Sequence, residues 1–416
     1  MSSATTFGGR DRSVLRKQRR NGDTSRDGRG RVAKGPAILH YGFRPFFLAA
    51  ALWAAFAVPL WLSIHLLGFE LGGPFDGLTW HSHEMMFGYV GAVIAGFILT
   101  AVPNWTGRLP LSGLPLAGLF GLWALGRLSN ALLPVPPAAL LIDLAFPVTL
   151  VFVVWREVFA GRNWRNAPVA AMLTLFGIAN LLQHLEGFGL VPSGIGIRLG
   201  LSTVALLIAL IGGRIVPSFT RNWLVKQGDK HLPAEFGRLD KAALLTVVLA
   251  SLAWLALPGT PISGIALSAA GIALALRLSR WRGLAAAREP IVAFLHLGYG
   301  WLALALLILG ASALAEDPLS ATAGLHALTA GAIGSMTLAV MTRASLGHTG
   351  RAIVADRWTL GIYGAVTLGA ALRVAAPLMP TFYSHLLACG GMLWSAAFLM
   401  FALRYGPILT RPRLAG

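Results

Sequence analysis

The sequence is poor in charged residues and has almost no cysteine. Only 12% of its 416 residues are charged, whereas a soluble domain usually carries about 25%, so an ordinary water-soluble enzyme is excluded. The single cysteine, Cys389, excludes an intramolecular disulfide, and no C-x-x-C-H motif is present for covalent haem attachment. P-loops, nucleophile elbows and zinc-protease helices are also missing. What remains is the composition of a helical membrane protein, with 56% hydrophobic residues and 49 glycines.

Long apolar runs fill the chain from Phe46 onward. Each has about 20 residues, enough to cross a hydrocarbon core about 30 Å thick. We therefore expect an all-α polytopic membrane protein with twelve transmembrane helices, which would form three four-helix arcs. The predicted spans are residues 46–67, 80–102, 111–132, 136–155, 167–186, 196–217, 239–257, 262–279, 291–314, 322–342, 358–376 and 381–403.

Positive charge is distributed unevenly over these spans. Residues 1–34 hold ten Lys or Arg and three Asp, without an apolar signal segment, so residues 1–36 are predicted to be a disordered basic tail and 37–416 the twelve-helix domain. If the N-terminus lies inside, 31 of the 34 Lys and Arg fall on the inner side. The three near the outer side are Arg127, Arg198 and Arg373. The positive-inside rule then predicts cytoplasmic termini. The net charge of +18 thus indicates topology and affinity for a lipid bilayer, not a nucleic-acid partner.

A weak repeat accompanies this pattern. Similar segments end the second, sixth and tenth predicted spans: Val102-Pro103-Asn104-Trp105-Thr106, Val216-Pro217-Ser218-Phe219-Thr220 and Val340-Met341-Thr342-Arg343. They indicate three four-helix units, or only that interfacial turns in general favour proline, aromatic residues and threonine.

Six of the ten histidines are predicted to lie in one outer layer. An imidazole inside a bilayer usually marks metal ligation, proton transfer or substrate contact; interfacial hydrogen bonding is the alternative. The six are His65, His81, His83, His184, His326 and His385.

The segment Trp80-His81-Ser82-His83-Glu84 is the sharpest of these signals. Residues i and i+2 of a helix point about 200° apart, so His81 and His83 are expected to serve two sites on opposite faces. Glu84 follows His81 by three residues, where a carboxylate can support that imidazole, ligate a metal or transfer protons. Glu84 is therefore the candidate catalytic residue.

Cofactor candidates extend beyond this segment. The predicted metal or haem ligands are His81, His83, His184 and His326, although His184 can instead bond Asn180 one turn earlier. His296 and His348 on the inner side indicate either a second cofactor or proton-entry site, or a satisfied core histidine and a loop contact. The outer cations Arg127, Arg198 and Arg373 are candidate partners for haem propionates, and Asp143 is a candidate for a proton path.

Several motifs in order resemble the NnrS family, over nearly the whole chain except the tail. They are Gly42-Phe43-Arg44-Pro45-Phe46-Phe47-Leu48, Trp80-His81-x-His83-Glu84-Met85, Val102-Pro103-Asn104-Trp105-Thr106-Gly107-Arg108, Pro217-x-Phe219-Thr220, His326-Ala327-Leu328-Thr329 and Met341-Thr342-Arg343 through Gly347-His348-Thr349-Gly350-Arg351. The resemblance implies a bacterial inner-membrane protein of twelve helices, associated with haem and copper and with protection from nitric oxide and nitrosative stress.

A weaker, architectural similarity is to the catalytic subunits of haem-copper oxidases and nitric oxide reductases. In those proteins histidines of helices two and ten bind a haem, and His83 and His326 resemble that pair. The sequence departs from the pattern in helices six, seven and ten, which lack the further histidines. A copper site would therefore have to draw on His81, His184 and Glu84.

These observations lead to one hypothesis and one rival. The hypothesis is a redox protein that binds haem b through His83 and His326, with His81 and His184 on a nearby haem or copper. It would bind and reduce nitric oxide with electrons from quinol or an external donor. The rival is a non-enzymatic haem or copper sensor or transporter in the same response.

Overall fold

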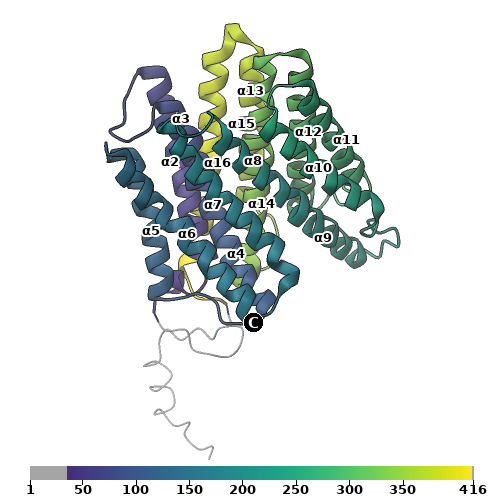
Figure 1. Cartoon of the computed structure of the whole chain (residues 1–416). Coiled ribbons are helices and arrows are strands. Elements are labelled where there is room, and N and C mark those ends of the chain that lie inside the picture. Colours follow the sequence, from purple (N-terminus) through teal and green to yellow (C-terminus); the bar gives the residue numbers. More distant parts are fainter. Residues whose placement is uncertain (1–34, 415–416) are drawn as a thin grey trace, which may run out of the picture.

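The computed structural model describes residues 35–414, and this part of the chain is helical without strands (Figure 1). Residues 1–34 of the expected basic tail lie outside the described residues, so the tail remains a prediction.

Twelve long helical rods follow one another along the described part of the chain. In order they are α2 (Phe43–Leu67), α3–η2–α4 (Gly77–His83, Glu84–Val90, Gly91–Thr106), α5 (Leu114–Leu132), α6 (Pro136–Ala160), α7 (Ala167–Gly187), α8–η4–α9 (Ile195–Leu207, Ile208–Gly212, Gly213–Lys226), α10 (Arg238–Ala256), α11 (Pro261–Ser279), α12 (Pro290–Ala315), α13–η5–α14 (Pro318–His326, Ala327–Ile333, Gly334–His348), α15 (Arg357–Ala375) and α16 (Tyr383–Thr410). Short 3₁₀ turns are η1 (Ala37–Leu39), η3 (Trp164–Asn166), η6 (Ala376–Leu378) and η7 (Pro380–Phe382).

Eleven of the twelve rods are long and apolar enough to cross a membrane. The remaining one, α5, has 19 residues and buries Arg127 and Asn130 on the side that packs against its neighbours. The prediction of a twelve-helix membrane protein is confirmed. The predicted and observed ends differ most where a polar turn extends the rod past the apolar core, as at Lys226 in α9.

Apolar side chains cover the outside of the bundle as well as its interior. Leu141, Phe152, Leu252 and Leu368 are more than half exposed on α6, α10 and α15. Such a surface is unfavourable in water and suits lipid tails, because the helices already satisfy their own backbone hydrogen bonds. The chain is an integral membrane protein.

Three rods are interrupted by a π-helical turn, and they are the second, sixth and tenth. The turns η2, η4 and η5 occupy similar depths in α3–η2–α4, α8–η4–α9 and α13–η5–α14, and α8 packs against both η2 and η5. Gly200 of α8 allows this approach, since a Cβ there would lie 3.3 Å from Met86. This recurrence is what a repeat of three four-helix units predicts.

The bundle has two distinct ends. At one, Arg44 of α2 donates to the carbonyl oxygens of Leu409 at 2.7 Å and Arg411 at 2.6 Å, so that the start of α2 and the end of α16 lie together. We call this the terminal end; the C-terminus is marked there in Figure 1. The opposite, distal end holds α3 and α13 (Figure 1) and, with them, the six histidines of the predicted layer.

A candidate metal centre at the distal end

His83 owes its position to the capped start of the second rod. The Asp76 carboxylate accepts hydrogen bonds from the backbone amides of Leu78 at 2.9 Å and Thr79 at 3.1 Å, which fixes the first turn of α3. Burial opposes ionisation of Asp76, but the hydrogen bonds from Thr79 and Leu78 prevail and lower its pKa below the ordinary value. The capped helix ends at His83, where the π turn begins with Glu84. Turns of this kind are frequent at functional sites.

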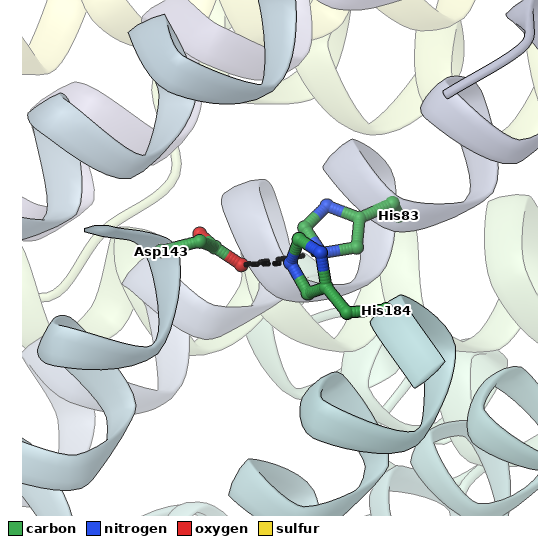
Figure 2. A group of neighbouring side chains, drawn as sticks. All are labelled: His83, Asp143 and His184. Carbon is green, nitrogen blue, oxygen red and sulfur yellow. Dashed lines mark hydrogen bonds and ion pairs between the residues drawn. The ribbon is translucent and has the colours of Figure 1, made fainter. Parts of the chain in front are cut away.

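His83, Asp143 and His184 meet from α3, α6 and α7 (Figure 2). We call them the buried triad, because their exposed fractions are 0%, 1% and 3%. The Asp143 Oδ2 atom lies 3.2 Å from Nε2 of His83 and 3.1 Å from Nε2 of His184. One nitrogen or oxygen atom from each residue lies within 4.8 Å of the other two. The donor atoms therefore converge on one point from which bulk water is excluded.

Arg127 and Asn180 orient the buried triad. The Arg127 guanidinium bonds Asp143 through Nη2, and its Nη1 lies 3.2 Å from Oε2 of Glu84. Nε2 of His83 lies 2.9 Å from Oδ1 of Asn180, and Nδ2 of Asn180 donates to Oδ2 of Asp143 at 2.9 Å. Since oriented partners of this kind fix ring orientation and ligand basicity, the triad has the supporting contacts that metal sites require.

The charges around the triad do not balance without an added cation. Glu84 and Asp143 contribute −2 and Arg127 contributes +1, so the sum is −1 when both histidines are neutral. Both nitrogens of His83 face oxygens, with Nδ1 3.1 Å from Glu84 Oε1 and Nε2 2.9 Å from Asn180 Oδ1. A neutral imidazole has only one N–H, so one contact lacks a proton. An added proton or metal ion would supply both the missing positive charge and a partner for the second nitrogen of His83.

Polar atoms beside the triad are also left without hydrogen bonds. Among the described residues, Glu84 Oε2, Arg127 Nη1 and Trp53 Nε1 are buried and have no hydrogen-bond partner, although the first two form the ion pair described above. All three converge on Gly88, where a Cβ would lie 2.6 Å from Arg127 Nη1 and 2.8 Å from each of the other two atoms. Unsatisfied buried groups are rare in native proteins, and these three atoms pack so closely around Gly88 that a side chain of any size there would displace them.

The donor set fits a first-row transition metal. A metal about 2.0–2.2 Å from imidazole nitrogen and carboxylate oxygen holds tetrahedral ligands about 3.3–3.6 Å apart, slightly more than the 3.1 and 3.2 Å found. Two histidines and one carboxylate suit iron, and imidazole suits copper equally. A monovalent copper ion brings the charge sum to zero, whereas a divalent ion leaves +1. The residues present can therefore hold either metal.

A second set of histidines lies on the opposite side of the second rod. The His81 ring stacks on Trp61 with 4.1 Å between ring centroids, and Trp61 stacks on His65 at 5.1 Å. Both His81 and His326 lie within electrostatic reach of Arg373. We call His65, His81, His326 and Arg373 the distal histidine group. Its separation from His83 is what the 200° offset between His81 and His83 predicts.

The distal histidine group also presents unsatisfied atoms. His326 donates its Nδ1 proton to the carbonyl oxygen of Thr322 at 2.8 Å, which leaves a lone pair on Nε2. Within the described part of the chain, His81 Nδ1 and Arg373 Nη1 are buried without hydrogen bonds. The structure thus brings His326 together with His81, and His83 together with His184; it does not bring His83 and His326 into one group.

The other predicted site residues lie apart from both groups. His296 donates its Nδ1 proton to the carbonyl oxygen of Val292 at 3.0 Å, as a satisfied core histidine does. His348 packs its ring on Phe43 at the terminal end, 5.5 Å between centroids. Arg198 donates to the carbonyl of Ser193 at 3.3 Å.

The sequence pointed to His83, His184 and Asp143 one by one, but not to the contacts that bring them together. Arg127 was expected beside a haem propionate, but it pairs with Asp143 and Glu84. Asn130, which donates to Glu84 Oε1 at 3.2 Å, was not foreseen. A usable signal was present, since Arg127 and Asp143 are opposite charges within successive apolar spans and have few other partners in a bilayer.

Two comparisons with known proteins bear on this site. A family model described as NnrS protein matches residues 37–413, which is nearly the whole chain. No curated protein matches it.

Proposed function

This chain belongs to the NnrS family, and from that premise we propose that it is a metalloprotein of the bacterial nitric oxide response whose buried triad binds copper. The observation that carries the proposal is the convergence of His83, Asp143 and His184 in a site that water does not reach. Neutral imidazoles are good copper ligands, and copper stands above iron in the order of divalent affinities. A dry, apolar membrane interior also favours a small uncharged gas over water.

Nitric oxide is the proposed ligand of this site, and its reduction the proposed reaction. Two nitric oxide molecules, two protons and two electrons give one nitrous oxide and one water. Glu84 is suited to hold a proton, because its Oε2 accepts no hydrogen bond while Oε1 accepts from Asn130. Copper, when bound, supplies the redox centre; quinol or an external donor supplies the electrons.

Haem b is the second proposed cofactor, and the distal histidine group has donors that fit it. His326 offers an Nε2 lone pair, and His81 lies in the same group. The unsatisfied Arg373 suits a propionate, since a bare metal cation is repelled there. We therefore propose His326 and His81 as the haem ligands, in place of the sequence-based pair of His83 and His326.

The proposed location is the bacterial inner membrane, with the terminal end in the cytoplasm. The tally of 31 Lys and Arg on one side supports this orientation. Arg156, Arg221, Arg280 and Arg404 all lie near the terminal ends of their helices. In this orientation both metal-binding groups lie toward the outer surface.

Nitric oxide consumption by the purified protein tests the proposal. We expect the copper-loaded protein with a reduced donor to consume nitric oxide anaerobically, and His184→Ala to lose this activity and the copper. His231→Ala is the matched control, because that side chain is 83% exposed and far from the triad. Copper-dependent binding of nitric oxide without its consumption would support the rival hypothesis, a non-enzymatic sensor or transporter. Consumption that persists in His184→Ala would place the chemistry elsewhere.

A further inference from the structure

A cavity of about 300 Å³ opens at the terminal end of the bundle, between α2, α4, α9 and α14. Its volume is at the lower limit of small-molecule sites, about 300–1,000 Å³. Thr100 lines it, and Thr100 follows His83 by 17 residues in the same rod, a rise of about 25 Å at about 1.5 Å per residue. The cavity is therefore separate from the buried triad.

Aromatic rings form much of the cavity wall. Phe43 and Phe47 come from the first turns of α2, and Phe97 and Trp105 from the last turns of α4. The walls are otherwise mainly aliphatic, with Ile215 among them. Such a lining favours a flat, apolar ring system, because aromatic rings pack face to face or edge to face.

Two polar side chains lie at the exposed edge of this cavity. Arg214 and His348 both line it and are exposed, and neither side chain forms a hydrogen bond or ion pair with another described residue. The hydroxyl of Thr100, by contrast, is committed to the Gly96 carbonyl at 2.7 Å. A guanidinium only donates hydrogen bonds, and an imidazole donates one. The fitting ligand is therefore a flat ring with hydrogen-bond acceptors, which the surrounding membrane can deliver.

We propose that this cavity binds a membrane quinone. Arg214 and His348 donate to its carbonyl oxygens, and the Phe43, Phe47, Phe97 and Trp105 rings pack against its head. A lipid acyl chain would also fit an apolar wall, but it has no acceptor for these two donors. The quinone site goes beyond the metal centre and does not depend on its occupancy.

The test uses the full-length protein in nanodiscs of quinone-free lipid, titrated with decylubiquinone. We expect about one bound quinone per chain, and a loss of affinity of tenfold or more in His348→Phe, which removes a donor. Ala344→Phe, which fills the cavity, is expected to lose as much. Arg221→Met on α9 is the matched control, since this exposed cation does not line the cavity; its affinity is expected to stay unchanged.

Copper content separates this result from that of the metal centre. All four proteins are expected to retain the same copper content and thermal midpoint, so that a folding defect is recognised. Equal quinone binding by wild type and Ala344→Phe would overturn the proposal. Displacement of the quinone by palmitate at equal concentration would also overturn it, because palmitate has a carboxylate acceptor but no flat ring, and the aromatic wall would then confer no preference for a quinone. Failure of copper binding with intact quinone binding would refute only the metal proposal.

Discussion

Replacing Arg127 by methionine is expected to destabilise the copper-free protein by about 3–5 kcal/mol, the usual result of removing one partner from a buried ion pair. The guanidinium is 3% exposed and contacts both Asp143 and Glu84. Its removal changes the charge sum at the site from −1 to −2, with no water to screen the two carboxylates. The free energy of unfolding can be measured by titration with sodium dodecyl sulfate in mixed micelles.

A compensating variant separates charge from packing. Adding Glu84→Gln to Arg127→Met returns the sum to −1, so most of the lost stability should be recovered. Copper should also reduce the loss in Arg127→Met, because the cation replaces the missing positive charge. The control is Arg108→Met, whose ion pair with Glu157 is 47% exposed on the arginine side and should change stability by about 1 kcal/mol or less. The reasoning is refuted if the double variant is no more stable than Arg127→Met.

Three further predictions concern Gly88 beside the triad and two polar contacts elsewhere in the bundle. Gly88→Ala places a Cβ 2.6 Å from Arg127 Nη1 and should weaken copper binding about 10–100-fold, as loss of a metal-supporting contact does. Competition with a chelator measures the copper affinity. The control is Gly118→Ala, whose Cβ meets no atom within 4 Å and which should bind copper normally. Burial opposes a low pKa at Asp356, but hydrogen bonds at the start of α15 lower it. The ionised Asp356 carboxylate therefore contributes its full stabilisation at neutral pH, and this is lost as the pH falls through the pKa of the folded state. The difference in thermal midpoint between wild type and Asp356→Asn should then shrink on acidification. A difference that stays constant with pH would count against a stabilising role for the carboxylate. Arg277→Met breaks a fully buried pair with an aspartate 2.8 Å away, and should lower stability by about 3–5 kcal/mol while leaving the copper stoichiometry at wild-type level.

The helices could be predicted from the sequence because a bilayer imposes a simple rule. About 20 apolar residues must be continuous, and charges must collect at the ends. α6 therefore begins at Pro136, where a predicted span begins, and α12 at Pro290, one residue before the span predicted from 291. The π turns were not predicted, since one extra residue per turn leaves hydropathy unchanged. The π turn recurs in the second, sixth and tenth rods, and this supports the repeat that short motifs such as Val102-Pro103 indicated.

The candidate site was harder to predict, because it depends on how each helix is rotated. The offset between His81 and His83 correctly separated them, since two residues on one helix keep a fixed angle. The pairing of His83 with His184 and Asp143 requires the rotation of α6 and α7 relative to α3, which composition does not specify. The pairing of His83 with His326 on one haem drew on an architectural likeness, whereas the described structure places His326 within electrostatic reach of His81 and Arg373.

The central claim is that the buried triad binds copper through two imidazoles. Electron paramagnetic resonance of the oxidised, copper-loaded protein tests it most directly. The account predicts one copper per chain with hyperfine coupling to two imidazole nitrogens, from His83 and His184, and coupling to only one in His184→Ala. A copper signal with the same nitrogen coupling in wild type and His184→Ala, or no bound copper in either, would contradict it.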